Sequence, residues 1–518
     1  MNGAQALIRT LVDAGVDVCF GNPGTSEMHF VAALDSVPEM RAVLSLFEGT
    51  VTGAADGYGR MAGRPAATLL HLGPGLGNGI ANLHNARRAH TPIVNVVGDH
   101  ATYHKRFDAP LESDIDALAG TVSGWVRRSG RVADVAADAA AAIAAACEPP
   151  GQVATLILPA DVSWLDGAVP AAPVEPAGRE IVADDVVAAA AKVLGSGEPT
   201  VLLLGGAALR DESALAAASR LAAATGVTVL AETFPARIRR GAGIPAIDRL
   251  GYLAEHVQFQ LTGAKHLVLA GARSPVSFFA YPGKASDLVP EGCAVHTLAD
   301  VAQDVVGALA NLADLAAAGV EPVRAPVRRP DLPSGDLTPQ NWADVIGALV
   351  PEHAIIADEA NTSGVLLPQA MAGAPAHDVL TLTGGAIGQG LPVATGAAVA
   401  CPDRPVICLE ADGSAMYTLS ALWTHARENL DVTTVVLNNS AYAILRMELQ
   451  RVGAAAGGER AASLLDLSRP DLDFVALATG MGVPASRART AEELADQFRR
   501  ATAEPGPHLI EAVVPPLM

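Results

Sequence analysis

The sequence contains little cysteine, few aromatic residues and few basic ones. Its 518 residues include five cysteines, 4% aromatics, and 35 Lys and Arg against 55 Asp and Glu, so the formal net charge is −20. The cysteines are odd in number and never spaced as C-x-x-C, which argues against a disulfide scaffold or a zinc ribbon and predicts reduced thiols in a cytoplasmic protein. The acidic excess argues against a nucleic-acid partner, because phosphate backbones are bound by clustered Lys and Arg.

Long uninterrupted apolar runs are also missing. The Ala-rich stretch 133–147 is broken by Asp134 and Asp138, and no segment reaches the roughly 20 apolar residues of a membrane span. The first twenty residues lack the charged-then-apolar layout of a signal peptide. These absences predict a soluble protein without a membrane partner, working in the cytoplasm.

Short runs of Val, Ile and Leu alternate with Ala-rich helical stretches through most of the chain. Continuous apolar strands separated by helices are typical of parallel sheets covered on both faces. The pattern therefore predicts an α/β protein built from doubly wound parallel sheets. The clearest expected strands are 93–97, 154–158, 200–204, 266–270, 354–357, 406–409 and 433–437.

Two segments break the alternation. Residues 165–178 are rich in Pro and Ala, and residues 321–337 carry four prolines, as extended linkers do. Cutting the chain there predicts three α/β domains, at 1–165, 180–320 and 337–518.

Polar residues end two neighbouring strands near the C-terminus. The strand VICLEA runs into Asp412-Gly413-Ser414, and the strand TTVVLNN ends in Asn439. In open α/β sheets ligands bind at the carboxyl edge of the strands. Asp and Asn oxygens, with the backbone carbonyl of Ala441, suit Mg²⁺, which keeps phosphate oxygens and water as its other ligands. Either motif alone would suggest turn residues, but the pair favours a metal and the phosphates that it carries.

This stretch resembles the diphosphate-binding motif of thiamine diphosphate enzymes, which usually begins Gly-Asp-Gly and ends Asn-Asn; here the first glycine is Ala411. The segments FGNPGTSEMHF, LSLFEGTVTGAADGYGRMAGRPA and LLHLGPGLGNGIANLHNARRAHTPIVNVVGD are similar to the pyrimidine-binding domain of that superfamily. Over nearly the full chain the sequence resembles acetolactate synthase large subunits of the actinobacterial type and benzoylformate decarboxylases. The resemblance implies a pyrimidine-binding, a central Rossmann-like and a diphosphate-binding domain, in that order.

The resemblance also implies roles for particular residues. Glu48 matches the catalytic glutamate that hydrogen-bonds N1′ of the cofactor pyrimidine from a neighbouring subunit, and Ile387 the apolar residue that bends the cofactor. Asn361 and Thr362 match a turn that contacts the diphosphate, with helix capping as the alternative. The expected cofactor-binding residues are Asn361, Thr362, Gly385, Ile387, Asp412, Gly413, Ser414, Asn439 and Tyr442, and the expected metal ligands are Asp412, Asn439 and Ala441.

His71 lies where benzoylformate decarboxylases carry an active-site histidine and acetolactate synthases a residue that does not ionise. A histidine beside the cofactor can move protons or hold the substrate carboxylate; a buried structural histidine is the alternative. The resemblance also makes Thr25, Ser26 and Asn78 the expected substrate contacts, and the first two are equally suited to cap the next helix.

The departures from both families concern the substrate and FAD. Phe278 and Phe279 stand near the expected place of the second histidine of benzoylformate decarboxylases, and the segment after Asn439 lacks the tryptophan by which acetolactate synthases select the second 2-oxo acid. Acetolactate synthases usually hold FAD in the central domain. Here the strand 201–204 leads only into a diglycine, a weak nucleotide signal, and no bound FAD is expected.

The expected function is thiamine diphosphate- and Mg²⁺-dependent decarboxylation of a small 2-oxo acid with carboligation, as in acetolactate synthases. The alternative is a benzoylformate-type decarboxylase, because of His71. A catalytically weak cofactor-binding homologue is supported only by Ala411, and an NAD-linked protein is disfavoured by the missing glycine fingerprint. The resemblance implies a homodimer or homotetramer with shared sites.

Overall fold

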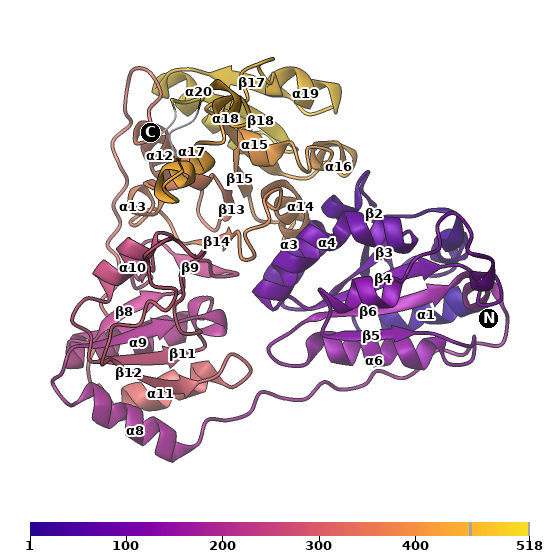
Figure 1. The fold of residues 1–518 in the computed structure, drawn as a ribbon, viewed down its shortest axis with the longest axis horizontal. Helices are drawn as coiled ribbons and strands as arrows, with labels where there is room; N and C mark the ends of the chain where they lie inside the picture. Colours follow the sequence, from indigo (N-terminus) through magenta and orange to yellow (C-terminus); the bar gives the residue numbers. More distant parts are fainter. Residues whose placement is uncertain (455–457, 516–518) are drawn as a thin grey trace.

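A computed structural model describes residues 1–454 and 458–515, and it confirms the expected class of three parallel-sheet α/β domains (Figure 1). The N-terminal domain is indigo to purple, the central one magenta to pink and the C-terminal one orange to yellow. The expected linker at 165–178 is an extended connection that runs below the N-terminal domain to α8 (Asp184–Leu194). No helix among the described residues is long and apolar enough to cross a membrane.

The N-terminal sheet has the order β2-β1-β3-β4-β6-β5, with every pair parallel. Along β4, Ile93 and Val97 face one hydrophobic core while Val94 and Val96 face the other, so both faces of the sheet are covered. Its strands are β1 (Val18–Asn22), β2 (Arg41–Leu44), β3 (Ala66–Leu70), β4 (Ile93–Asp99), β5 (Trp125–Arg128) and β6 (Val153–Pro159). Its helices are α1 (Gly3–Asp13), α2 (Met28–Ala33), α3 (Glu48–Ala62), α4 (Leu72–Ala89), α5 (Ile115–Gly120), α6 (Val135–Cys147) and α7 (Ala160–Trp164).

The central sheet has the order β10-β8-β7-β11-β12 and is also parallel throughout. The diglycine Gly205-Gly206 follows β7, and Gly206 N–H donates to Glu232 Oε1 at 2.9 Å. The expected absence of FAD stays a prediction. The strands are β7 (Thr200–Leu204), β8 (Thr228–Ala231), β10 (Asp248–Arg249), β11 (His266–Ala270) and β12 (Ala294–Ala299), and the helices after α8 are α9 (Glu212–Thr225), α10 (Ala254–Gln260) and α11 (Val305–Ala316).

The C-terminal sheet has the order β17-β18-β16-β15-β13-β14-β9. Its edge strand β9 (Ile238–Arg240) comes from the central stretch of the chain and pairs antiparallel with β14. The other strands are β13 (Ile355–Glu359), β14 (His377–Thr381), β15 (Val406–Ala411), β16 (Val432–Asn438), β17 (Ala485–Ala488) and β18 (His508–Val513). The helices are α12 (Asn341–Leu349), α13 (Leu367–Ala370), α14 (Gly390–Ala400), α15 (Asp412–Ala415), α16 (Ala421–Arg427), α17 (Ala443–Arg451), α18 (Glu459–Ser463), α19 (Phe474–Gly480) and α20 (Ala491–Ala503).

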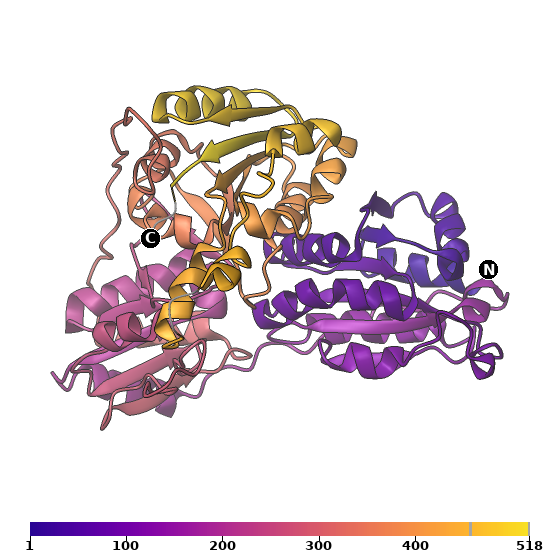
Figure 2. The same cartoon turned by 45° about the horizontal axis from the view of Figure 1, so that its top comes forward.

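The N- and C-terminal domains meet where α3 packs against α14 (Figures 1 and 2). A Cβ atom on Gly57 would overlap the backbone of Val393, and one on Gly396 would overlap the carbonyl of Ala54. Glycine therefore lets the two helix backbones approach more closely than any side chain would allow. One hydrophobic core runs through this contact and includes Val51, Ala54, Val393 and Ala397.

Candidate active site

The carboxyl ends of β15 and β16 bring the two C-terminal motifs together. Asp412, only 2% exposed, accepts from its neighbour Gly413 N at 2.9 Å and from Asn439 N at 3.2 Å. Asn439 Oδ1 in turn accepts from Ala441 N at 3.0 Å. Burial raises the pKa of Asp412 to about 6, although backbone N–H groups oppose the shift. The carboxylate of Asp412, the amide of Asn439 and the backbone N–H of Ala441 thus lie side by side.

A third strand contributes a turn to the same place. After β13, residues 361–364 form a 3₁₀ turn in which Asn361 Nδ2 donates to Ser414 Oγ at 3.3 Å. Thr362 belongs to the same turn. The ring of Tyr442 lies directly over Gly413, where a Cβ atom would overlap it. The predicted diphosphate contacts from three separate segments are therefore neighbours.

These residues fit a hard cation whose coordination is completed by phosphate oxygens. The donor set of Asp412, Asn439 and the Ala441 carbonyl is all oxygen, which suits Mg²⁺. Within residues 1–454 and 458–515, no group of three or more His, Cys, Asp and Glu side chains is arranged to hold a metal by itself. A cation here would need further oxygens, and a diphosphate supplies them.

A glycine-rich loop at 382–389 lies next to this edge. Gly385 has φ +75° and Gly388 φ +89°, backbone conformations that glycine adopts without strain. The carboxylate of Glu359, at the end of β13, accepts from Gly388 N at 2.8 Å and from Gly390 N at 2.5 Å. Burial raises the pKa of Glu359 to about 7. The half-buried Ile387, predicted to bend the cofactor, lies in the same loop.

Glu48 begins α3 and is held by two amides. Its side chain sits after β2 at the carboxyl edge of the N-terminal sheet and is 8% exposed. Asn22 Nδ2 donates to Oε1 at 3.1 Å, and Asn78 Nδ2 donates to Oε2 at 3.0 Å. Asn78, predicted to contact the substrate, therefore orients Glu48 in this structure. Asn22 was not predicted, although it belongs to the FGNPGTSE segment.

His71 immediately precedes α4 and is paired with a buried acid that sequence reasoning missed. Its Nδ1 lies 2.8 Å from Oε2 of Glu27, whose residue is 1% exposed and which also accepts from Gly24 N at 2.7 Å. Burial raises the pKa of Glu27, and the neighbouring His71 partly opposes this shift. Thr25 and Ser26, the other predicted substrate contacts, lie in the same 3₁₀ turn as Glu27.

A single glycine lies between Glu48 and His71. A Cβ atom on Gly75 would be 3.3 Å from Glu48 Oε1 and 3.5 Å from His71 Cβ. The N-terminal domain thus gathers an oriented carboxylate and an imidazole–carboxylate pair in one cluster. Among the described residues, no hydrogen bond or ion pair joins this cluster to the Asp412–Asn439 cluster of the same chain.

The three α/β domains, the oxygen donors at the carboxyl edge of β15 and β16, and the separate Glu48–His71 cluster suit an enzyme with a phosphate-bearing cofactor. The comparisons with known proteins name that cofactor. Residues 1–119 match the model of the thiamine pyrophosphate enzyme N-terminal TPP binding domain, and residues 363–512 match that of the C-terminal TPP binding domain. The chain belongs to the thiamine diphosphate-dependent enzymes, which confirms the sequence-based recognition.

The similar proteins are named either as acetolactate synthases or as decarboxylases. The chain is 67% identical, over 100% of both chains, to a Mycobacterium tuberculosis protein provisionally named acetolactate synthase large subunit IlvX. It is 30% identical to the benzoylformate decarboxylase of Pseudomonas aeruginosa over 96% of each. The solved structure of a thiamine diphosphate-dependent 4-hydroxybenzoylformate decarboxylase from Rhodococcus jostii RHA1 superposes with a TM-score of 0.87 at 26% identity, covering 99% of both chains.

Proposed function

We propose that the protein decarboxylates a 2-oxo acid with thiamine diphosphate and Mg²⁺, and that His71 delivers the proton that completes the product. The observation that supports this most is the His71–Glu27 pair at 2.8 Å, beside Glu48. Decarboxylation to an aldehyde ends with a proton placed on carbon, and this pair could supply it. Carboligation instead ends with a proton placed on the carbonyl oxygen of the second 2-oxo acid. The resemblance to benzoylformate decarboxylase over 96% of the chain points the same way.

When bound, thiamine diphosphate supplies an electron sink for the pair released as CO₂ leaves. Asp412, Asn439 and the carbonyl of Ala441 would hold Mg²⁺ with the diphosphate. Gly385 and Ile387 would support the pyrimidine ring.

Glu48 would exchange a proton with the pyrimidine of the bound cofactor. Asn22 and Asn78 each donate to one of its oxygens, at 3.1 and 3.0 Å, so the carboxylate is held in one orientation. Preorganised hydrogen bonds of this kind spare the cost of reorienting the acid during the reaction. Asn78 therefore acts on the reaction through Glu48.

His71 serves as the acid through its other ring nitrogen. With Nδ1–H donating to Glu27 Oε2, Nε2 is left to take up and release the proton. Glu27 is held in turn by Gly24 N–H, so the imidazole ring has a fixed orientation. A buried carboxylate beside the ring stabilises the charged imidazolium until the proton is given up.

The nearby side chains favour a 2-oxo acid with a bulky apolar group. Phe278 touches the glycine-rich loop, since a Cβ atom on Gly385 would lie 2.8 Å from its ring. Its ring also lies 5.2 Å from that of Tyr252. Glu448 of α17 accepts from Tyr281 Oη at 2.8 Å. The 4-hydroxybenzoylformate decarboxylase structure supports an aromatic substrate of this kind.

Carboligation, the reaction expected first from the sequence, is the second candidate. It is favoured by the 67% identity to the protein provisionally named acetolactate synthase large subunit. The two candidates share the decarboxylation and differ in whether a proton or a second 2-oxo acid ends the reaction.

The proposal is tested by separating CO₂ release from product release. His71→Ala should leave the first equivalent of CO₂ nearly unchanged in a single turnover while slowing product release on the order of 100-fold or more, the usual worth of an acid–base group. Glu27→Gln should do the same to a smaller extent, and His29→Ala, an exposed histidine, should do neither. If His71→Ala releases product at the wild-type rate, His71 is a structural residue and the proposal is wrong.

A further inference from the structure

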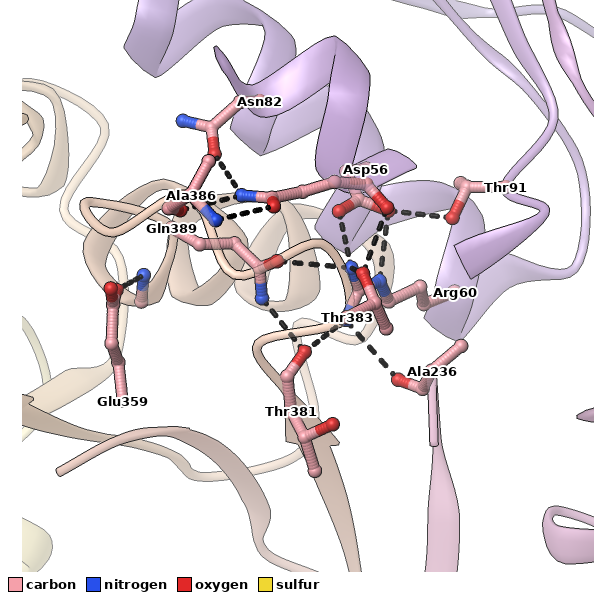
Figure 3. Close-up of polar contacts among 12 residues, drawn as sticks. Asp56, Arg60, Asn82, Thr91, Ala236, Glu359, Thr381, Thr383, Ala386 and Gln389 are labelled. Carbon is pink, nitrogen blue, oxygen red and sulfur yellow. Dashed lines mark hydrogen bonds and ion pairs between the residues drawn. The ribbon is translucent and has the colours of Figure 1, made fainter. Parts of the chain in front are cut away.

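Arg60 is a buried charge at the junction of the three domains (Figure 3). It lies in the last turn of α3, and its side chain is 1% exposed. Its Nε and Nη2 donate to the two oxygens of Asp56 at 2.8 and 2.5 Å. Thr91 Oγ1 also donates to Asp56, at 2.5 Å, so the carboxylate is firmly placed.

The remaining N–H groups of Arg60 leave its own domain. Nη1 donates to the carbonyl of Thr381 at 2.8 Å and to that of Ala236 at 3.3 Å. Nη2 donates to Thr383 Oγ1 at 3.0 Å and to Gln389 Oε1 at 3.3 Å. Only the planar fork of a guanidinium reaches this many acceptors in one orientation.

The acceptors in the C-terminal domain lie at the two ends of the glycine-rich loop. Thr381 and Thr383 precede Gly385 and Ile387, and Gln389 follows them. Gln389 Nε2 donates to the carbonyl of Thr381 at 2.9 Å, so the loop is closed on itself where Arg60 binds. Arg60 thus fixes the base of the loop from outside the domain that contains it.

Helix α4 holds the interior of the same loop. Asn85 Nδ2 donates to the carbonyl of Ala386 at 2.8 Å, and Ala386 N donates back to Asn85 Oδ1 at 3.2 Å. His84 Nε2 lies 3.1 Å from the carbonyl of Gly384. On the opposite side Glu359 accepts from Gly388 N in the loop and from Gly390 N just after it. The N-terminal domain therefore supplies most of the polar contacts that shape a C-terminal loop.

Stability alone does not account for a guanidinium in this place. The attraction within a wholly buried ion pair offsets little more than the cost of removing both charges from water. A protein with apolar residues of similar volume in their place is often at least as stable. What an apolar pair would lack is the set of bonds to Thr381, Thr383 and Gln389.

We propose that Arg60 is the positioning residue of the cofactor pyrimidine. It acts through Thr383 and Gln389, which set the loop so that Gly385 and Ile387 meet the ring, and it touches neither the cofactor nor the substrate. The inference rests on the proposed placement of the pyrimidine on residues 382–389. It does not depend on which reaction follows.

The test is the affinity for thiamine diphosphate, measured by calorimetry with Mg²⁺ present, together with the Tm of each protein without cofactor. Arg60→Lys keeps the charge and loses the fork, and should raise the Kd for thiamine diphosphate at least tenfold. Thr383→Val is close in size and removes the hydroxyl that accepts from Arg60 Nη2 and donates to the carbonyl of Asn85. It should raise the Kd severalfold while lowering the Tm by only a few degrees. Arg64→Lys is the matched control, because Arg64 pairs with Asp17 at the surface and should leave the Kd unchanged.

A wild-type Kd in Arg60→Lys overturns the proposal. If that variant does not fold, Thr383→Val decides, and an unchanged Kd there overturns it equally. Ile387→Ala separates the role of Arg60 from the placement of the pyrimidine. A raised Kd in Ile387→Ala with an unchanged one in Arg60→Lys rejects only the role of Arg60, whereas an unchanged Kd in both rejects the placement as well.

Discussion

Glu48 is the side chain on which the proposed chemistry depends most, and its surroundings explain how a lone carboxylate can serve it. Two amide donors hold its oxygens, and the neighbouring His71 is paired with Glu27. The carboxylate is thus oriented without being neutralised by an ion pair. It can exchange a proton with a ring nitrogen placed before it.

Replacing Glu48 by Gln should abolish turnover while the cofactor still binds. The amide keeps the size of the side chain but cannot take up a proton, so kcat should fall on the order of 10³-fold. The Kd for thiamine diphosphate, measured with Mg²⁺, should change by less than a factor of about ten. Turnover near the wild-type rate would refute the role assigned to Glu48.

At the residue scale, the sequence predicted the functional residues that lie in recognisable motifs. It missed the residues that orient them through hydrogen bonds. Glu48, His71 and Asp412 could be found because they stand in recognisable segments. Glu27 and Asn22 could not, because their roles arise only when β1, α3 and α4 meet in space. Asn78 was predicted to contact substrate, but a single sequence cannot tell that its amide turns toward Glu48.

At the scale of elements, the packing of α16 on α14 buries a histidine that must stay neutral. His425 is 0% exposed, and its Nε2 donates to Thr395 Oγ1 at 2.8 Å, since that hydroxyl already donates to Leu391. Nδ1 is buried without a partner among the described residues. Burial lowers the pKa of His425 to about 4, because a second proton would be placed where nothing accepts it.

This histidine makes the fold sensitive to acid. Its folded pKa lies below the unfolded value of 6.5, so its contribution is full above pH 6.5 and is lost as the pH falls toward 4. The loss amounts to about 3 kcal/mol of the free energy of unfolding. His425→Gln should show a correspondingly flatter denaturant-unfolding profile between these pH values, and His29→Gln should follow the wild type. Parallel curves for His425→Gln and the wild type would contradict the account.

The elements themselves could be predicted well because apolar strands between helices leave a clear pattern. The expected strand at 200–204 matches β7, and that at 93–97 lies within β4. The strand β9 was missed, since three residues carry no periodicity and its partner β14 lies far along the chain. The close crossing of α3 and α14 also depends on which glycines face each other, and composition alone does not give that.

At the scale of the whole molecule, the two clusters belong to different domains, and among the described residues no hydrogen bond or ion pair joins them. The resemblance predicts that Glu48 of one chain serves the Asp412 site of another. The domain limits at 1–165, 180–320 and 337–518 also remain predictions.

Complementation tests the shared site. Glu48→Gln and Asp412→Asn should each be inactive as homodimers. Heterodimers carrying one of each, isolated by two different tags, contain one site with both residues intact and should recover about half of the wild-type activity. Heterodimers as inactive as their parents would mean that each site is built within a single chain.

The central claim is that a proton ends the reaction, and proton NMR of the products tests it most directly. The enzyme would be incubated with thiamine diphosphate, Mg²⁺ and either pyruvate or phenylglyoxylate in D₂O. The account predicts an aldehyde bearing deuterium at the formyl carbon, formed faster from phenylglyoxylate because of Phe278. Acetolactate from pyruvate as the main product, with no aldehyde from either acid, would contradict it and make the protein a carboligase.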